Sequence, residues 1–157
     1  MAARVDRQRR QILHKGSGIA LAGLLAALGL SRPARGEWQQ SAFAAKTMDE
    51  ALAALGVTPP ETSAAILLMV PEIAENGAVV PVTVSSSLAR VEQISILVDK
   101  NPNVLAAHFV LPEGTDGFIT ARVKMGQTAT VIALVKADGK FYRVSREVKV
   151  TAGGCGG

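Results

Sequence analysis

Short apolar runs separated by turn residues occupy residues 66–150, and they limit the folds that this chain can adopt. In the segment 118–125, apolar and polar side chains alternate, which is the pattern of a half-buried β-strand. Strands are predicted at seven places: 66–70, 79–84, 93–98, 104–111, 118–125, 128–136 and 141–150. Seven short strands with turn signals between them favour an antiparallel β-sandwich, although a barrel has the same local pattern.

Proline and glycine indicate how some of these strands are placed. Pro81 cannot donate a backbone hydrogen bond to a neighbouring strand, so the second strand is predicted at a sheet edge or a bulge. Gly126-Gln127 is predicted to join the fifth and sixth strands as a hairpin. Asp138-Gly139 is predicted to make a tight turn between the sixth and seventh strands.

A short helix is predicted ahead of the strands, over residues 47–55. Thr47 and Glu50 stand three residues apart as a capping box, in which each side chain accepts a hydrogen bond from the other residue's backbone N–H. Gly56 follows the last apolar residue of the segment and is predicted to end the helix.

The first 44 residues have the composition of an export signal. Arg9-Arg10 precede an apolar run over residues 18–30, which is too short for a comfortable membrane span but fits the apolar core of a signal peptide. The paired arginines, the apolar pair after them and Lys15 resemble a twin-arginine signal, and an ordinary secretory signal is the alternative.

Two positions fit cleavage of this signal. Cleavage after Ala44 has alanines at the −3 and −1 positions, whereas cleavage after Gly36 is closer to the apolar run. The first position is preferred. Export by the twin-arginine signal is expected to place the mature protein in the periplasm. The predicted organisation is a signal peptide over residues 1–44, a short helix and linker over 45–60, a β-sandwich domain over 61–150 and a flexible glycine-rich arm over 151–157.

The charge distribution argues against a nucleic-acid partner. The chain has 17 Lys and Arg residues and 13 Asp and Glu residues, a net charge of +4. Seven basic but only two acidic residues lie in residues 1–44, so residues 45–157 have 10 basic and 11 acidic residues, a net charge of −1. A nucleic-acid-binding surface needs clustered Lys and Arg on the folded domain. No membrane contact is predicted after signal cleavage either.

The few cysteine and histidine residues exclude several kinds of site. Cys155 is the only cysteine, which excludes an internal disulfide and a metal site built on paired cysteines. His14 lies in the leader and His108 in an apolar strand, where a structural role is expected. No metal site and no catalytic set are predicted, so the chain is not expected to be an enzyme.

The connection after the first predicted strand is the one polar segment with a second interpretation. Glu72 and Glu75 precede the turn signal Asn76-Gly77. A solvated loop is the simpler interpretation of these carboxylates, and a recognition loop is the functional alternative.

The C-terminal residues are Gly153-Gly154-Cys155-Gly156-Gly157. Glycine loses the most conformational freedom on ordering, and untied termini tend to be disordered, so a mobile, extended arm is predicted. The glycines leave the sulfur of Cys155 without side-chain shielding, so the thiol could enter a narrow active site of another protein. The alternatives are an accidental thiol, a ubiquitin-like carrier that uses the terminal Gly-Gly, and an interaction module whose cysteine forms an intermolecular disulfide.

This tail resembles the carrier motif of the SoxY family, the sulfur carriers of thiosulfate oxidation. The segment 71–82 resembles the N-terminal segment of the SoxY domain, and a twin-arginine leader is expected of that family. The resemblance implies an immunoglobulin-like antiparallel β-sandwich. It also implies that Cys155 is the point of covalent sulfur attachment, on a flexible arm formed by Gly153, Gly154, Gly156 and Gly157.

The resemblance also implies partners. SoxY-like proteins form a heterodimer with SoxZ, a smaller β-sandwich subunit. The haem enzyme SoxAX couples thiosulfate oxidatively to the cysteine as an S-thiosulfonate, and the dinuclear-manganese hydrolase SoxB releases sulfate. Where present, the molybdenum and haem enzyme SoxCD oxidises the remaining sulfane sulfur. No cofactor is implied for this chain beyond the S-thiosulfonate or persulfide on Cys155.

Overall fold

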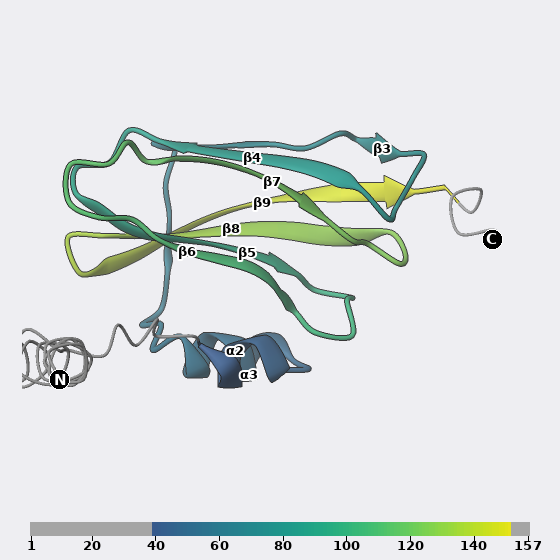
Figure 1. Cartoon of the computed structure of the whole chain (residues 1–157), viewed down its shortest axis with the longest axis horizontal. Helices are drawn as coiled ribbons and strands as arrows, with labels where there is room; N and C mark the ends of the chain where they lie inside the picture. Colours follow the sequence, from purple (N-terminus) through teal and green to yellow (C-terminus); the bar gives the residue numbers. More distant parts are fainter. Residues whose placement is uncertain (1–38, 152–157) are drawn as a thin grey trace, which may run out of the picture. The chain divides into compact units, whose positions relative to one another are not determined.

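The computed structural model of the protein describes residues 39–151, which form two short helices and two β-sheets (Figure 1). The helices are α2 (Gln40–Ala44) and α3 (Met48–Ala54). The strands are β1 (Glu61–Thr62), β2 (Ile66–Met69), β3 (Ile73–Ala74), β4 (Val80–Ser86), β5 (Val91–Val98), β6 (Leu105–Val110), β7 (Phe118–Val123), β8 (Ala129–Ala137) and β9 (Lys140–Val150). The seven predicted strands correspond to β2 and β4 to β9.

The strands form a larger and a smaller sheet. The larger sheet has the order β1-β9-β8-β5-β6, with β3 also paired to β9, and the smaller one has the order β2-β4-β7. The long strands pair antiparallel, and the two-residue strands β1 and β3 pair parallel with β9. The two sheets lie in layers, one above the other (Figure 1). The predicted immunoglobulin-like β-sandwich is therefore confirmed.

The main core lies between the two sheets. On β4 alternate residues are buried, as expected for a strand with one face on a core. Removing apolar surface from water in this layer is the main force that holds the sheets together. The fully buried apolar residues that β4, β5 and β8 contribute to this core are Val80, Val82, Val84, Ile94, Ile96, Val98, Val131, Ala133 and Val135.

The two helices cover the outer face of the larger sheet (Figure 1). In α3, the Thr47 side chain accepts a hydrogen bond from the Glu50 N–H at 3.3 Å, and the Glu50 carboxylate accepts one from the Thr47 N–H at 3.2 Å, which confirms the predicted capping box. The backbone N–H of Lys46, 2.9 Å away, is the main cause that lowers the pKa of Glu50. Ala51 and Leu55 are buried against the sheet.

The helix α2 was not predicted, because its residues were assigned to the export signal. Ala42 is fully buried in the layer between the helices and the larger sheet, and Ala45 directly after α2 is also buried there. The Val104 N–H donates a hydrogen bond to the Ala45 carbonyl oxygen at 3.2 Å. Five residues are too few to show a helical period in the sequence.

One prediction about strand pairing is wrong, and a second holds only at the residue concerned. The connection at Gly126-Gln127 does not close a hairpin, because β7 belongs to the smaller sheet and β8 to the larger one. The strand that contains Pro81 is the middle strand of the smaller sheet instead of an edge strand. The proline is tolerated because the pairing of β4 with β2 ends at Thr83, so that β7 alone borders β4 at Pro81.

Candidate functional site

The predicted attachment residue Cys155 and the four glycines around it lie outside the described residues. The structure describes the strand that leads to them, β9, as far as Thr151. The candidate site therefore consists of the surface from which the C-terminal segment starts, at the end of β9.

The strand β3 holds the end of β9 in place. The Lys149 N–H donates to the Glu72 carbonyl oxygen at 2.9 Å, and the Thr151 N–H donates to the Ala74 carbonyl oxygen at 3.2 Å. Figure 1 shows β3 beside the C-terminal end of β9. This strand was missed in the sequence, where the segment is a polar connection, because two residues cannot show an alternating pattern.

The turn after β3 packs tightly on the end of β9. The Met125 N–H donates to the Gly77 carbonyl oxygen at 2.6 Å, and the Asn76 side chain accepts from the Ala78 N–H at 2.9 Å. A Cβ atom on Gly77 would lie 2.3 Å from the Met125 carbonyl oxygen and 2.9 Å from a methyl carbon of Val150. Glycine is therefore required at this position for the close approach of two backbone segments.

Exposed apolar and charged side chains surround the end of β9, and we call them together the root surface. Ile73 is 57% exposed, although it is next to the buried Ala74. A cavity of about 320 Å³ lies beside Ile73 on the edge of β9. The root surface consists of Glu72, Ile73, Arg146, Glu147 and Lys149.

The charges of the root surface remain available for a partner. Glu72, Arg146, Glu147 and Lys149 are all exposed, and none of them forms a salt bridge with another described residue. The structure brings Glu72 and Glu75 to this end of the sandwich, as the recognition-loop alternative requires. Their backbone position beside β9 could not be predicted from the sequence.

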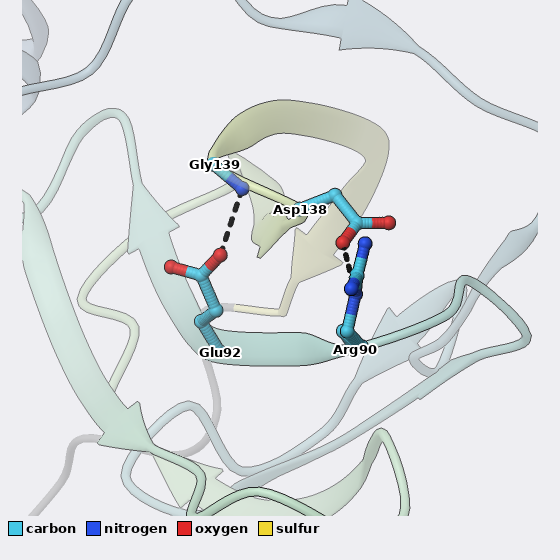
Figure 2. Close-up of polar contacts among 4 residues, drawn as sticks. All are labelled: Arg90, Glu92, Asp138 and Gly139. Carbon is cyan, nitrogen blue, oxygen red and sulfur yellow. Dashed lines mark hydrogen bonds and ion pairs between the residues drawn. The ribbon is translucent and has the colours of Figure 1, made fainter.

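The opposite end of the sandwich contains the turn between β8 and β9. Asp138 and Gly139 have φ angles of +51° and +73°, as a two-residue hairpin turn requires, so the predicted tight turn is confirmed. In Figure 2, Arg90 pairs with Asp138, and the Glu92 carboxylate accepts the Gly139 N–H at 2.7 Å. The second oxygen of Glu92 is 2.9 Å from the Lys136 ammonium group.

These contacts determine the electrostatics of the turn. The hydrogen bond from Lys136 is the main cause that lowers the pKa of Glu92, and the Gly139 N–H adds to it. A cavity of about 850 Å³ is lined by Arg90, Glu92 and Asp138 at this end. Because these three side chains already have partners within the body, they have less capacity to bind a ligand.

His108 lies on β6, away from the root surface. Its Nδ1 atom is 2.9 Å from the Ser95 hydroxyl, and its buried Nε2 atom has no hydrogen-bond partner among the described residues. Burial lowers the pKa of His108, which favours the neutral ring. Strand pairing places it level with Arg143, seven residues before the end of β9, about 23 Å along the strand.

Residues 39–151 lack the features of two other kinds of site. They contain no group of three or more His, Cys, Asp or Glu residues that could hold a metal ion. Within the same residues, no helix is long and apolar enough to cross a membrane.

Comparison with known proteins points to one family. The family model of the sulfur oxidation protein SoxY matches residues 51–155, which are 105 of the 157 residues. Among solved structures, the chain is 41% identical to the sulfur carrier protein SoxY from Chlorobium limicola f thiosulfatophilum, over 66% of this chain and 94% of that one, with a TM-score of 0.59. The comparison with curated proteins gives no match.

A more distant likeness concerns the fold alone. The superoxide reductase (neelaredoxin) from Ignicoccus hospitalis is 14% identical and has a TM-score of 0.50, over 55% of this chain and 80% of that one.

The family match covers most of the domain and includes Cys155 as its last residue. The chain therefore belongs to the SoxY family of sulfur carrier proteins.

Proposed function

We propose that this chain is a periplasmic sulfur carrier that holds thiosulfate-derived sulfur covalently on Cys155. It presents this sulfur to the enzymes of the thiosulfate-oxidation pathway and is not itself an enzyme. The observation that carries the proposal is the family match, which runs through the domain to Cys155. The backbone hydrogen bonds between β3 and the end of β9 give the C-terminal segment a fixed starting point.

The length of the C-terminal segment determines how far the sulfur can travel. Cys155 is five residues after Val150, and an extended chain advances about 3.4 Å per residue, so the thiol can reach about 17 Å from the end of β9. A tethered substrate stays at a high local concentration while it is transferred between enzymes.

The proposed chemistry begins with the oxidation of the Cys155 thiol and thiosulfate together. The thiol and S₂O₃²⁻ form Cys–S–S–SO₃⁻ and release one proton and two electrons, which the haem enzyme SoxAX accepts. Hydrolysis by the SoxB hydrolase then cleaves the bond between the sulfane sulfur and the sulfonate group. Water adds to the sulfonate group, and the products are sulfate, a proton and the persulfide Cys–S–SH.

The partners proposed for this chain are those that its resemblance to the SoxY family implies. SoxZ is proposed as a permanent subunit in a heterodimer, and SoxAX and SoxB as enzymes that engage the carrier transiently. Where SoxCD is present, it would oxidise the remaining sulfane sulfur on Cys155. No metal or organic cofactor is proposed for this chain.

The twin-arginine leader is proposed to export the carrier to the periplasm. The complete burial of Ala42 under the larger sheet is a reason to keep α2 in the mature protein. This observation supports cleavage after Gly36 over cleavage after Ala44. N-terminal sequencing of the exported protein is expected to give Glu37 as the first residue, and a start at Ala45 would contradict this choice.

The proposal is tested by replacing the thiol. The substitution Cys155→Ser should abolish thiosulfate-dependent turnover in a system reconstituted with SoxZ, SoxAX and SoxB. Circular dichroism and SoxZ binding should not change, because Cys155 follows the last strand and the body does not depend on it. Turnover that survives this substitution would reject the carrier function.

A further inference from the structure

His108 is held by one hydrogen bond on the outer face of the larger sheet. On β5, Ile94 and Ile96 point into the core between the two sheets, so Ser95 between them points to the opposite face. Ser95 is fully buried, and its hydroxyl oxygen lies 2.9 Å from the His108 Nδ1 atom on the neighbouring strand β6. The Nε2 atom of the same ring is also buried, but it has no hydrogen-bond partner among the described residues.

Only the neutral ring fits this environment. A neutral ring can donate its Nδ1–H to the Ser95 hydroxyl and leave Nε2 without a proton. Protonation would add an N–H group and a positive charge at Nε2, which is buried and has no acceptor in the described part of the chain. A buried charge without a partner is costly, and burial accordingly lowers the pKa of His108.

The elements packed against β6 offer no free carboxylate to compensate a charged ring. They are β5, α2 and β7. Neither α2 nor β6 contains a charged residue, and the single charged residue of β7, Arg122, lies on the outer face of the smaller sheet, level with Pro81. The only carboxylate of β5, that of Glu92, is already bonded to Lys136 and to the Gly139 N–H.

The other strands of the larger sheet supply positive charge on this face. Strand pairing places Arg143 of β9 in the same row as Ser95 and His108, with β8 between them. Lys136 of β8 lies in the next row. These cations do not stabilise a charged ring, because like charges disfavour the protonated form of a histidine.

We propose that the contact between His108 and Ser95 is an acid-sensitive contact that holds the edge strand β6 in place. Protonation would drive the ring from its buried position toward water and break its hydrogen bond to Ser95. β6 is the last strand in the order β1-β9-β8-β5-β6, so its pairing with β5 is the part of the sheet that would loosen. The helices would be affected too, because the Val104 N–H, just before β6, donates to the Ala45 carbonyl oxygen at 3.2 Å.

The direction of the pH dependence follows from burial. Because the folded pKa of His108 lies below its ordinary value of 6.5, the opened form binds the proton more readily than the closed form. The contact therefore contributes its full stability above pH 6.5 and loses it as the pH falls from 6.5 through the folded pKa.

The proposed sulfur chemistry produces the acid to which this contact would respond. The coupling of thiosulfate to the thiol and the hydrolysis that follows each release a proton. The chain has two histidines, and the other one, His14, lies in the predicted leader. Histidine is the side chain whose ordinary pKa lies between about pH 5 and pH 8, so His108 is the residue of the domain suited to sense this change. This use rests on the proposed carrier function, whereas the contact itself does not.

The test compares hydrogen exchange in the exported carrier at about pH 7.5 and about pH 5.5, on either side of the ordinary histidine pKa. The Leu111 N–H, which donates to the Glu92 carbonyl oxygen at 2.8 Å, reports on the pairing of β6 with β5. After correction for the intrinsic pH dependence of exchange, its protection should fall several-fold at the lower pH, by up to about tenfold. The reference is the Ser86 N–H, which donates to the Gly117 carbonyl oxygen at 2.7 Å, and its protection should stay within about a factor of two.

Two variants separate protonation from the loss of a side chain. In His108→Asn, the amide can still bond to the Ser95 hydroxyl from the position of Nδ1 but does not titrate, so Leu111 should be equally protected at both pH values. The matched variant Ser95→Ala keeps the histidine and removes its partner. The difference between the two pH values should then be smaller, because the ring is no longer held in its buried position. Should His108→Asn fail to fold, Ser95→Ala makes the same comparison.

Two results would overturn the inference. A loss of Leu111 protection that persists unchanged in His108→Asn would assign the effect to another group. An equal loss at Ser86 would show that acid weakens the whole domain instead of the edge strand. Neither result bears on the carrier function, because these measurements do not involve Cys155, and an inactive thiol would likewise leave the contact between His108 and Ser95 standing.

Discussion

Both ends of the sandwich contain an Asx-Gly pair, but the two glycines are required for different physical reasons. At the turn between β8 and β9, Gly139 has a φ angle of +73° and a Cβ atom would meet no other atom within 4 Å. At the other end, the φ angle of Gly77 is outside the left-handed region, and a Cβ atom would lie 2.3 Å from a backbone oxygen. Gly139 is favoured by its backbone conformation, whereas Gly77 is required because there is no space for a Cβ atom.

The charges at the two ends also differ. Around the hairpin turn, Arg90 and Asp138 pair with each other, and Glu92 bonds to Lys136 and to Gly139 (Figure 2). The charged residues of the root surface form no salt bridge with another described residue. The larger of the two cavities lies at the hairpin end, away from the end of β9. The larger cavity and the unpaired charges therefore lie at opposite ends of the sandwich.

Among the variants that test this difference between the two ends, Gly77→Ala is expected to lower the free energy of unfolding most. The new Cβ atom must displace backbone at Met125 or the side chain of Val150, and overpacking of this kind costs about 2 kcal/mol of unfolding free energy. Urea denaturation measures the loss, and turnover should also fall because the root surface shifts. The control Gly126→Ala has no atom within 4 Å of its Cβ atom and should be nearly neutral.

Equal free energies of unfolding for these two alanine variants would show that the turn after β3 can shift at little cost to admit a Cβ atom. The end of β9 would then not be a rigid starting point for the arm, and the contrast between the two ends would disappear.

A smaller effect is expected for Gly139→Ala. The cost is about 1 kcal/mol of unfolding free energy, because alanine is strained at a positive φ angle even where space is available. The KM of SoxB for the carrier should not change, since this turn lies at the far end from the arm. A raised KM would mean that the hairpin end also contacts the enzymes.

The smallest effect is expected for Glu92→Gln, and it depends on pH. The folded pKa of Glu92 lies below its ordinary value of 4.5, so its stabilising contribution is complete above pH 4.5 and is lost as the pH falls through the folded pKa. Because this carboxylate is exposed, the variant should lose less than about 1 kcal/mol at pH 7. Thermal unfolding from pH 7 to pH 3 should show the two proteins converging at low pH.

The control for this measurement is Glu113→Gln, because Glu113 lines the same cavity and forms no salt bridge with a described residue. A constant difference between Glu92→Gln and the unmodified protein over the whole pH range would contradict the role of the ionised carboxylate.

The local parts of the fold could be predicted from the sequence. The capping box of Thr47 and Glu50 and the turn at Asp138-Gly139 involve neighbouring residues, so short motifs define them. The pairing of β7 could not be predicted, because its partner β4 is more than 30 residues earlier and no local sequence pattern indicates which strand is its partner. The same is true of β3, which becomes a strand only where it meets β9.

The assignment of Cys155 as the attachment residue stays a prediction, because it lies outside the part of the chain that the structure describes. The residues around Cys155 point to a thiol carrier without any knowledge of the fold, because their chemistry is local. The root surface was missed because Ile73 looks like an ordinary strand residue until the fold places it, exposed, beside β9. A signal was nevertheless present, since Ile73 is an apolar residue in a polar connection.

Intact-mass spectrometry of the carrier, purified without reductant after incubation with thiosulfate and SoxAX, tests the central claim most directly. With SoxAX alone, an adduct of about +112 Da for S₂O₃ is expected on the intact carrier, and after SoxB is added it should be replaced by one of about +32 Da for a single sulfur atom, because a thiolate is open to reversible oxidative capping. The variant Cys155→Ser should show neither adduct. A disulfide-linked dimer with no sulfur adduct would contradict the carrier function and identify an interaction module instead.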